Sequence, residues 1–495
     1  MSRSEILDWL DIKGFKGAEA PNAPPQDPTL TRDMVNMHIE EGKLVPRPGA
    51  ATFQNADHDE EVTRFLDYNH LGTIHLLRFS LTGIQEWSGS AWADLTIGTA
   101  FTAVAGDNAD AAMFKDNLYV IPQPGVKPSK WTAAAGTVTQ IAAAVTARTL
   151  APYSAYLLLG YANADPRGIR YSNDGATWSA TDVLTMEDTP GFIMRISPFG
   201  GRAFVYKNTS VDFLKFVGSS TTTFGQDVLT EDVGLGAFNT LAGVSNLGQL
   251  FLGSDARLYL NNGTLQPILK RLSDRIRAEI NISAIGEAFG SVDPSKSTYT
   301  LFYPVASDSY SFRRMDINYL HGTAVLDNYE NLGSGLFIRG AYTTYGSVAP
   351  FFIMSDSSSA PKTYRLDTTT QLTDAGSNIT RYWTTDWLPT RGREIGEVQM
   401  TVKHKGRGVL KVLVADELGT VYDLLGTHTL KLDTKSVNLD IDNLADRIAG
   451  EDILSITEVN TRGDHVKFRI EFEPKTNHDD VDLRQFSIGF VKQEE

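Results

Sequence analysis

The chain of 495 residues contains no cysteine. This absence excludes disulfide bonds and thiolate chemistry, and it favours folding in a reducing cytosol. Residues 1–5 lack the apolar core of a signal peptide. No run of about 20 apolar residues is present, so we expect no transmembrane helix. If the protein leaves the cell, we expect it to leave inside a particle or by lysis.

Basic residues are also scarce, because 45 Lys and Arg stand against 60 Asp and Glu and give a net charge of −15. This balance argues against a protein that grips nucleic acid phosphates with a basic stripe. It is compatible with a wall past which nucleic acid slides, since like charge prevents sticking. The apolar fraction of 41% is typical of a folded protein, and the length predicts two or more domains.

Motifs for metal, cofactor or phosphate binding are missing from the sequence. The nine histidines are scattered, and no Glu stands at a helical ligand spacing from His70 or His75. The alternating carboxylates of a calcium loop and the Gly-x-x-x-x-Gly-Lys phosphate loop are absent. We therefore predict no metal, no cofactor and no catalytic residue, and we expect the protein not to be an enzyme.

What the sequence does contain is a repeated hairpin pattern, clearest in residues 247–268. Short apolar runs at 249–252, 257–260 and 265–268 are separated by Gly253-Ser254-Asp255 and Asn261-Asn262-Gly263. Such runs joined by Gly and Asn turns are typical of antiparallel hairpins, because these residues tolerate positive φ. One such sheet cannot bury both of its faces, so neighbouring sheets must stack on it.

Similar units recur through residues 51–377 at intervals of roughly 40 to 50 residues, the length of a four-stranded blade. This spacing predicts an all-β, irregular β-propeller of five to seven blades, of which we favour about six. An array of β-sandwiches would give similar runs and remains the alternative. Residues 378–495 change in character, and their alternating strands predict a separate C-terminal antiparallel β-sandwich.

Residues 1–50 form a third part. Ile6, Leu7 and Leu10 are spaced for one amphipathic turn, and the prolines at 21–28 predict an extended arm. Residues 34–39 then read as a strand, followed by a turn at Glu41-Gly42 and a short strand that ends at Pro46.

This strand, turn and Arg-Pro-Gly sequence resembles the N-terminal signature of propeller proteins from the tails and necks of short-tailed bacteriophages. There an Asn-(x)n-Gly-x-Leu-x-x-Arg-Pro-Gly pattern precedes the first blade. The matching residues here are Asn36, Gly42, Leu44, Arg47, Pro48 and Gly49. A plain hairpin with a Pro-Gly turn is the alternative explanation.

The resemblance implies a virion structural protein, a tail nozzle or tail-tube component located in the virion tail and assembled in the host bacterial cytoplasm. It implies a homo-oligomer, expected to be a hexamer, that surrounds the DNA exit channel, retains packaged DNA and guides its ejection. Its implied partners are the portal or adaptor ring, tail fibre or spike proteins, and double-stranded DNA that passes without specific binding.

Two polar loops are candidates for a gate in such a channel, judged from their composition alone. One is the Gly/Ser/Thr-rich segment 218–225, with Ser219, Thr222 and Phe224, and the other is 107–110, with Asp107 and Asn108.

A helix is predicted where Leu269, Leu272, Ile276 and Ile280 recur at helical spacing. Its polar face carries Lys270, Arg271, Arg275 and Arg277. A contact with DNA or an acidic partner is one interpretation, and a solvated face is the one we favour.

Residues 172–178, Ser-Asn-Asp-Gly-Ala-Thr-Trp, resemble the Asp-box hairpin of sialidases and related propellers. In those proteins the motif is a folding device. Sialidase chemistry needs three arginines and a Tyr-Glu pair, and no sequence feature groups arginines such as Arg170 and Arg195. The second functional hypothesis is a carbohydrate-binding or glycosidase-like propeller that acts as a receptor-binding tail protein, with Trp87 and Trp178 as candidate stacking residues. A cellular scaffold propeller is a third.

Overall fold

A computed structural model describes the chain in residues 7–13, 17–18, 30–31, 33–40, 43–53, 61–104, 107–131, 137–218, 223–244, 247–306, 313–320, 323–329, 339–344, 351–355, 362–368, 379, 381–385, 388–389, 394–405, 408–416, 423–430, 449–461, 465–474 and 480–491. The chain divides into two compact units. We call Thr52–Arg313 with Gly333–Arg365 the blade unit, and Met1–Ala51, Arg314–Leu332 and Leu366–Glu495 the sandwich unit.

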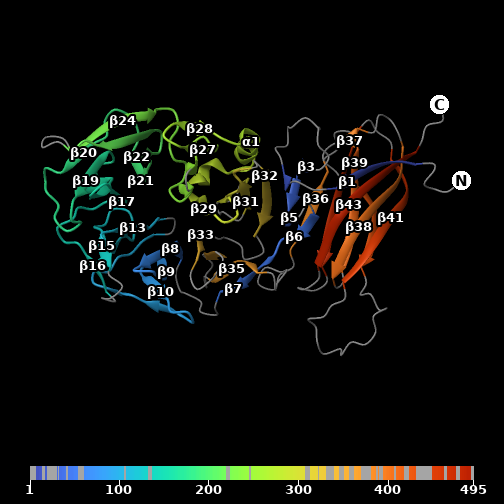
Figure 1. Ribbon diagram of the computed structural model, residues 1–495, viewed down its shortest axis with the longest axis horizontal. Coiled ribbons are helices and arrows are strands. Elements are labelled where there is room, and N and C mark those ends of the chain that lie inside the picture. The colour runs from blue at the N-terminus through green and yellow to red at the C-terminus, as the bar shows by residue number, and fades with distance from the viewer. Residues whose placement is uncertain are drawn as a thin grey trace. The chain divides into compact units, whose positions relative to one another are not determined.

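The blade unit contributes strands to seven sheets, four of which have four strands in sequential antiparallel order (Figure 1). The first of these contains β8 (Val62–His70), β9 (Thr73–Ser80), β10 (Ile84–Trp87) and β11 (Trp92–Asp94), and the second contains β17 (Thr149–Tyr153), β18 (Tyr156–Gly160), β19 (Gly168–Ser172) and β20 (Val183–Thr185). The third contains β21 (Ile193–Phe199), β22 (Arg202–Lys207), β23 (Val211–Phe216) and β24 (Phe224–Thr230), and the fourth contains β25 (Ala242–Val244), β26 (Gly248–Leu252), β27 (Leu258–Asn261) and β28 (Leu265–Pro267).

The remaining sheets of the blade unit vary in size. One has five strands, β12 (Thr96–Ile97), β13 (Asp110–Phe114), β14 (Asn117–Ile121), β15 (Ser129–Trp131) and β16 (Thr137–Gln140). The others include β29 (Phe289–Asp293) with β30 (Thr298–Tyr303), and β33 (Arg339–Thr343) with β34 (Phe351–Ser355) and β35 (Thr363–Thr368).

The inner strands of these sheets follow one another around a common centre (Figure 1). Strand β8 contacts β13, β13 contacts β17, β17 contacts β21, β25 contacts β29, β29 contacts β33, and β33 returns to β8. Between β21 and β25 the link is a hydrogen bond of 2.9 Å from Arg195 Nη1 to the Leu241 carbonyl. The blade unit is therefore propeller-like.

Side chains fasten the last inner strand to the first. The Thr343 hydroxyl on β33 donates to Asp67 Oδ1 on β8 at 2.7 Å, and the Thr344 amide donates to Asp67 Oδ2 at 3.0 Å. These residues lie 276 positions apart in the sequence. A second link joins Arg78 Nη1 to the Thr363 hydroxyl at 3.0 Å.

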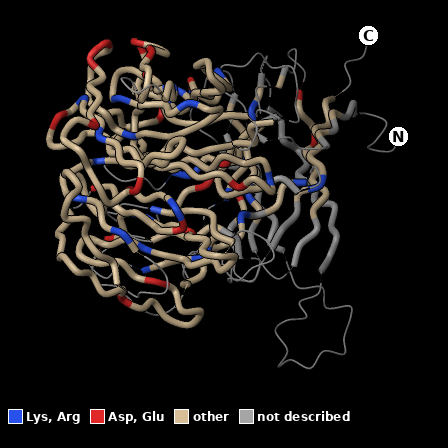
Figure 2. The backbone as a smooth tube through the Cα atoms, turned by 60° about the vertical axis from the view of Figure 1, so that its left-hand side comes forward, with Lys and Arg blue, Asp and Glu red and all other residues tan. Residues whose placement is uncertain are grey.

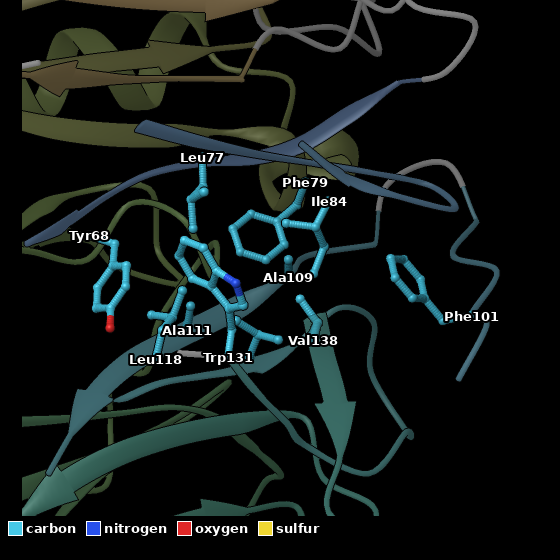
Figure 3. Close-up of a cluster of buried hydrophobic side chains, with 11 residues drawn as sticks. Tyr68, Leu77, Phe79, Ile84, Phe101, Ala109, Ala111, Leu118, Trp131 and Val138 are labelled. Carbon is cyan, nitrogen blue, oxygen red and sulfur yellow. The ribbon is translucent and has the colours of Figure 1, made fainter. Parts of the chain in front are cut away.

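Apolar clusters lie between successive sheets, as expected when both faces of a blade are covered. The cluster in Figure 3 combines side chains of the sheet of β8–β11 with those of the sheet of β12–β16. Trp131 lies at its middle and is 1% exposed, and its ring centroid is 5.1 Å from that of Tyr68. Packing of one sheet on the next thus supplies the burial that a single sheet lacks.

The predicted all-β class and the hairpin pattern are confirmed. In the segment 247–268, Leu250 pairs with Leu260 and Asn261 pairs with Leu265, so the apolar runs are adjacent antiparallel strands. Gly263 has φ +102°, the positive value expected of its turn. The preferred count of six blades is not confirmed, since seven sheets have strands in the blade unit.

The predicted helix is α1 (Lys270–Glu279). Leu272 and Ile276 are buried, in accord with the helical spacing of apolar residues. The predicted basic face is only partly exposed, because Arg275 is 5% exposed and its Nε is 2.7 Å from Glu279 Oε1. The described residues also include two 3-10 helices, η2 (Ala162–Ala164) and η3 (Ile282–Glu287).

The sandwich unit holds two larger sheets. One contains β41 (Ala449–Thr461), β38 (Ile395–Lys405), β43 (Asp480–Val491), β6 (Lys43–Pro46) and β5 (Met37–Glu40), with β1 (Leu7–Lys13) also paired to β43; the other contains β4 (Asp33–Val35), β36 (Arg381–Thr384), β42 (His465–Pro474), β39 (Gly408–Asp416) and β40 (Asp423–Leu430), with β37 (Leu388–Pro389) paired to β42. Phe486 of the first sheet packs on Trp383 and Phe468 of the second, with ring centroids 5.9 and 5.4 Å apart. The two sheets therefore face each other across an aromatic core.

Smaller strands complete this unit. They are β2 (Gly17–Ala18), β3 (Leu30–Thr31), β31 (Arg313–Asn318), whose first residue belongs to the blade unit, and β32 (Thr323–Asn328); β7 (Gly49–Thr52) ends at the unit boundary.

The N-terminal segment differs from the expected arm. Residues 7–13 form a strand that pairs antiparallel with β43, Leu7 opposite Val491, where an amphipathic turn was predicted. Cross-strand pairing outweighs the helical spacing of Leu7 and Leu10 here. The predicted boundaries at 1–50, 51–377 and 378–495 remain predictions, and the compact units group residues 1–51 and 314–332 with the C-terminal strands.

Charged residues are interspersed in the blade unit. Figure 2 shows Lys and Arg positions scattered among Asp and Glu positions along its strands and loops. No helix among the described residues is long and apolar enough to cross a membrane.

Candidate functional site: a cavity at the inner strands

A cavity of about 250 Å³ lies where the inner strands of the blade unit converge. Its lining comes from β8, β21, β25, β29 and β33, together with the loop that precedes β25. Three of the lining residues are arginines, Arg64, Arg195 and Arg339, and no lining residue is acidic. The fold thus brings together three cations that lie 131 and 144 positions apart in the chain.

Two of these arginines have carboxylate partners outside the lining. Arg64 Nη1 is 2.6 Å from Asp110 Oδ1 and also donates to the Ala109 carbonyl at 3.1 Å. Arg339 Nη2 is 2.9 Å from Glu287 Oε2. Each of these two charges is therefore balanced by one acid.

Asp110 is itself a junction between neighbouring blades. Its Oδ2 accepts from the Thr149 hydroxyl at 2.6 Å and from the Leu150 amide at 2.9 Å, both on β17. The carboxylate is 2% exposed and links β8, β13 and β17. Because its oxygens already accept from these partners, it attracts the third arginine without forming an ion pair with it.

Arg195 is the cation without an acidic partner among the described residues. Its Nη1 donates to the Phe238 and Leu241 carbonyls at 3.1 and 2.9 Å, and its guanidinium lies 5.1 Å from the Phe238 ring centroid. Burial, aided by repulsion from the Arg64 guanidinium and only partly offset by attraction to Asp110, lowers the pKa of Arg195 to about 10. The group is still charged at neutral pH, so the cavity carries one positive charge in excess.

Neutral polar groups complete the lining. The Asn239 carbonyl accepts from the Gly290 amide at 2.9 Å, and the Asn239 side-chain amide donates to Asn108 Oδ1. The Ser291 oxygen accepts from the Tyr342 amide at 3.2 Å, which leaves its hydroxyl proton for another acceptor. The cavity is therefore rich in donors and poor in acceptors.

The two predicted gate loops have different surroundings. Asn108 is in contact with the cavity through Asn239, and Asp107 closes its own turn by accepting from the Val104 amide at 3.0 Å. Phe224 is 3% exposed, at the start of the outer strand β24, and lies in an aromatic cluster with Tyr171 at 5.1 Å. Ser219 and Thr222 lie outside the described residues.

The signature residues form a buried network in the sandwich unit. Asn36 adopts φ +58°, which favours Asn over most residues, and its Oδ1 accepts from Arg47 Nε at 3.0 Å and from the Asn328 amide at 2.8 Å. The Arg47 guanidinium lies 4.0 Å from the Tyr329 ring centroid, and Nε is 3.9 Å from Asp327 Oδ1. The network fastens the β5–β6 hairpin to β32.

Sequence reasoning identified Asn36 and Arg47 but gave no signal for Asp327, which lies beside Arg47 although it is 280 positions away in the chain. The hairpin itself has the predicted register, with Met37 opposite Pro46. Pro48 supplies a carbonyl that accepts from Arg47 Nη1 at 3.2 Å, and Gly49 begins β7. Gly42 lies outside the described residues.

The Asp-box-like segment has the geometry of a folding device. Asp174 Oδ1 accepts from the Ala176 and Thr177 amides at 2.8 and 2.6 Å. These bonds, the one from Thr177 first, hold the pKa of the Asp174 carboxyl well below its ordinary value. Gly175 has φ +73°, and a Cβ there would lie 2.4 Å from the Tyr119 hydroxyl.

The candidate sugar-stacking residues are used in packing. Trp87 is 7% exposed and lies 4.8 Å from the Phe53 ring centroid and 5.3 Å from that of Trp92. Trp178 is half-buried against the cluster of β14, β17 and β18. Arg170, considered above for a carboxylate-gripping triad, donates to the Ser179 and Ala180 carbonyls and does not line the cavity.

Two of the histidines lie beside carboxylates. His75 Nδ1 is 2.5 Å from Glu86 Oε1, and His38 Nε2 is 3.0 Å from Asp327 Oδ2. No group of three potential metal ligands occurs among the residues that the structure describes.

No protein-family model matches the sequence, and no curated protein matches it. Among solved structures, the extracellular domain of a protein described as a one-component system of B. thetaiotaomicron has a TM-score of 0.43 at 10% identity, over 70% of this chain and 42% of its own. The WD40 β-propeller domain of Doa1 has a TM-score of 0.39 at 10% identity, over 65% of this chain and 97% of its own.

An exo-β-1,3-galactanase from Phanerochaete chrysosporium has a TM-score of 0.25 at 11% identity, over 90% of this chain and 100% of its own. This chain thus spans less than half of the first of these structures.

Proposed function

We propose that the protein is a non-enzymatic structural component of a virion tail, a nozzle or tail-tube protein of a short-tailed bacteriophage. In this role several copies form a homo-oligomeric ring around the DNA exit channel, retain packaged DNA and guide its ejection. The ring binds the portal or adaptor above it and fibre or spike proteins beside it.

The observation that carries the proposal is the network of Asn36, Arg47 and Asp327. The residues that resemble the phage signature are not a surface turn, because Arg47 is 0% exposed and Asn36 is 3% exposed. They use an Asn at positive φ and a fully buried Arg to fix one hairpin to a distant strand. A chance Pro-Gly turn would not require either residue type.

Two further properties support the proposal. The net charge of −15 suits a wall past which DNA slides, because phosphates are repelled rather than held. The propeller-like arrangement supplies rigidity, because each inner strand is fastened to the next by packing and by side chains such as Asp110.

The carbohydrate-binding alternative draws less support. Trp87 and Trp178, its candidate stacking residues, are engaged in packing. The lining of the arginine cavity has neither a Tyr nor an acid to serve as the nucleophile pair of a sialidase.

The test is the assembly state of the purified full-length chain, measured by sedimentation and by electron microscopy. We expect rings or short tubes with an axial lumen, of sixfold symmetry. The Arg47→Ala variant should lose rings together with the fold of the sandwich unit, whereas Lys215→Ala, an exposed substitution, should leave them intact. A chain that stays monomeric at every concentration and binds glycans on an array would contradict the proposal and support the receptor-binding alternative.

A further inference from the structure

The proposed role as a channel wall does not explain the arginine cavity of the blade unit. Three guanidinium groups line about 250 Å³ that contains no acidic side chain, and two carboxylates beside it, Asp110 and Glu287, neutralise two of them. Buried like charges repel each other, so such a grouping costs stability unless a negative charge joins it. Arg195 also joins β21 to the loop before β25, but the described residues supply no third acid for its charge.

We propose that the cavity is a binding site for a small oxyanion, with the size and charge of phosphate. Arg195 is its main ligand, and Arg64, Asn239 and Ser291 are the groups placed to assist. The site goes beyond the proposed role in a virion tail and does not depend on it.

The donor chemistry fits an oxyanion. Arg195 makes its hydrogen bonds to protein through Nη1 alone among the described residues, and its Nε–H and Nη2–H groups are the fork that binds two oxygens of one anion. The Phe238 ring and two carbonyls hold the guanidinium in place, so little side-chain entropy is lost on binding. Ser291 and Asn239 add neutral donors from β29 and the loop before β25.

The size of the cavity limits the ligand. Sites for drug-sized molecules begin at about 300 Å³, and this cavity is smaller. Nucleic acid is excluded as the ligand, because a duplex cannot enter such a volume and the net charge of −15 does not attract it. A free inorganic oxyanion, or the phosphate group of a small molecule, remains.

The location suggests what the anion does. The lining strands β8 and β33 are the first and last inner strands, and β21, β25 and β29 are three of the five inner strands between them. An anion bound to Arg64 and Arg195 links β8 to β21 across the centre, in addition to the contacts between neighbours. Binding therefore stabilises the closed arrangement of the sheets.

The experiment titrates the purified full-length protein with inorganic phosphate at constant ionic strength. Calorimetry measures binding, and the melting temperature of the blade unit measures stabilisation. We expect saturable binding to one site per chain and a melting temperature that rises with phosphate. In Arg195→Gln the affinity should fall roughly tenfold to a hundredfold, since a hydrogen-bonded charge is lost. The matched control Lys215→Gln removes a cation whose side chain is 49% exposed, and this variant should bind phosphate as the wild type does.

Absence of saturable binding in the wild type, or equal binding by wild type and Arg195→Gln, would overturn the proposal. Should Arg195→Gln fail to fold, Asn239→Ala supplies the second test, with a smaller loss of affinity expected and no change in charge. Competition by glycerol phosphate would assign the phosphate group of a larger molecule to the site, and its failure to compete would assign the free ion.

Discussion

Lys207 and Arg195 are both cations inside the blade unit, and their surroundings are opposite. Lys207 is 0% exposed, and its ammonium donates to the Met186 carbonyl at 2.7 Å and to Thr189, and lies 2.9 Å from Asp212 Oδ2. All three of its protons have acceptors, and its charge has a carboxylate. Arg195 has carbonyl acceptors for one nitrogen and no carboxylate among the described residues.

The difference separates a structural charge from a binding charge. A buried ion that is fully matched holds the fold and has no capacity left for a ligand. A cation with unused donors at a cavity is a candidate for recognition. The two residues can be compared within one unit, so differences in overall stability cancel.

The largest effect is expected at the matched cation. In Lys207→Met the Asp212 carboxylate stays buried without its counter-ion, and we expect a loss of about 3–5 kcal/mol in the free energy of unfolding. Urea unfolding followed by hydrogen exchange in β22 and β23 measures it. The control is Lys215→Met, whose exposed pair with Asp227 is screened by solvent, so this substitution should change the stability far less. Equal effects of the two substitutions would show that Lys207 is not a structural charge.

The next largest effect is expected at Phe224, a predicted gate residue that is buried in an aromatic cluster. Phe224 lies in a cluster with Tyr153, Tyr156 and Tyr171, so Phe224→Ala should cost about 3–5 kcal/mol through loss of burial and a cavity. Thermal unfolding measures the loss. Phe216, which is 46% exposed at the edge of the same cluster, is the matched control and should cost clearly less on truncation to Ala. A Phe224→Ala protein of unchanged stability would restore the gate hypothesis for this residue.

A matched charge also exists in the sandwich unit, and pH reveals it. Burial raises the pKa of Asp327, but attraction from His38 and Arg47 outweighs burial, so its pKa lies below the ordinary 3.8. A depressed carboxyl pKa contributes stability that is present above the unfolded-state value and is lost as pH falls through the folded-state value. We expect Asp327→Asn to cost about 2 kcal/mol at pH 6.

Denaturation of the sandwich unit at several pH values between 3 and 6 measures this contribution. The wild type should lose stability towards the acid end more steeply than Asp327→Asn. Parallel curves for the two proteins would mean that the carboxylate is not stabilised by its partners.

The smallest effect on stability is expected at the unmatched cation. Arg195→Gln removes two hydrogen bonds to carbonyls and also removes repulsion from Arg64, so the net change should be below about 1 kcal/mol. The same urea experiment used for Lys207→Met measures it. A loss as large as that of Lys207→Met would remove the distinction between the two cations and make Arg195 a structural residue.

Local patterns predicted much of the fold and little of the site. The hairpin at 247–268, the strand pairs and α1 depend on period and turn chemistry, which neighbouring residues in the sequence display. The Asp-box-like turn is also local, because its hydrogen bonds join residues two or three positions apart.

The cavity could not be predicted, because it depends on which inner strands meet. Arg64, Arg195 and Arg339 follow no common motif, and only the order of the sheets brings them together. The pairing of Leu7 with Val491 could not be predicted either, because strand partners so far apart in the sequence leave no local pattern. The sequence places Arg275 on an exposed face, whereas its 5% exposure is a property of the folded unit that the helical spacing does not show.

The first and last inner strands of the blade unit meet where Asp67 on β8 accepts a hydrogen bond from Thr343 on β33. Since the chain has no cysteine, the double variant Asp67→Cys/Thr343→Cys carries the sole thiols and can be treated with a short bismaleimide. We expect rapid intramolecular cross-linking of these two thiols, seen as a shift in gel mobility. The control pair Asp67→Cys/Thr230→Cys, with the second thiol on outer strand β24, should not cross-link. Failure of the first pair to cross-link while the protein remains folded would contradict the closed arrangement and the cavity that depends on it.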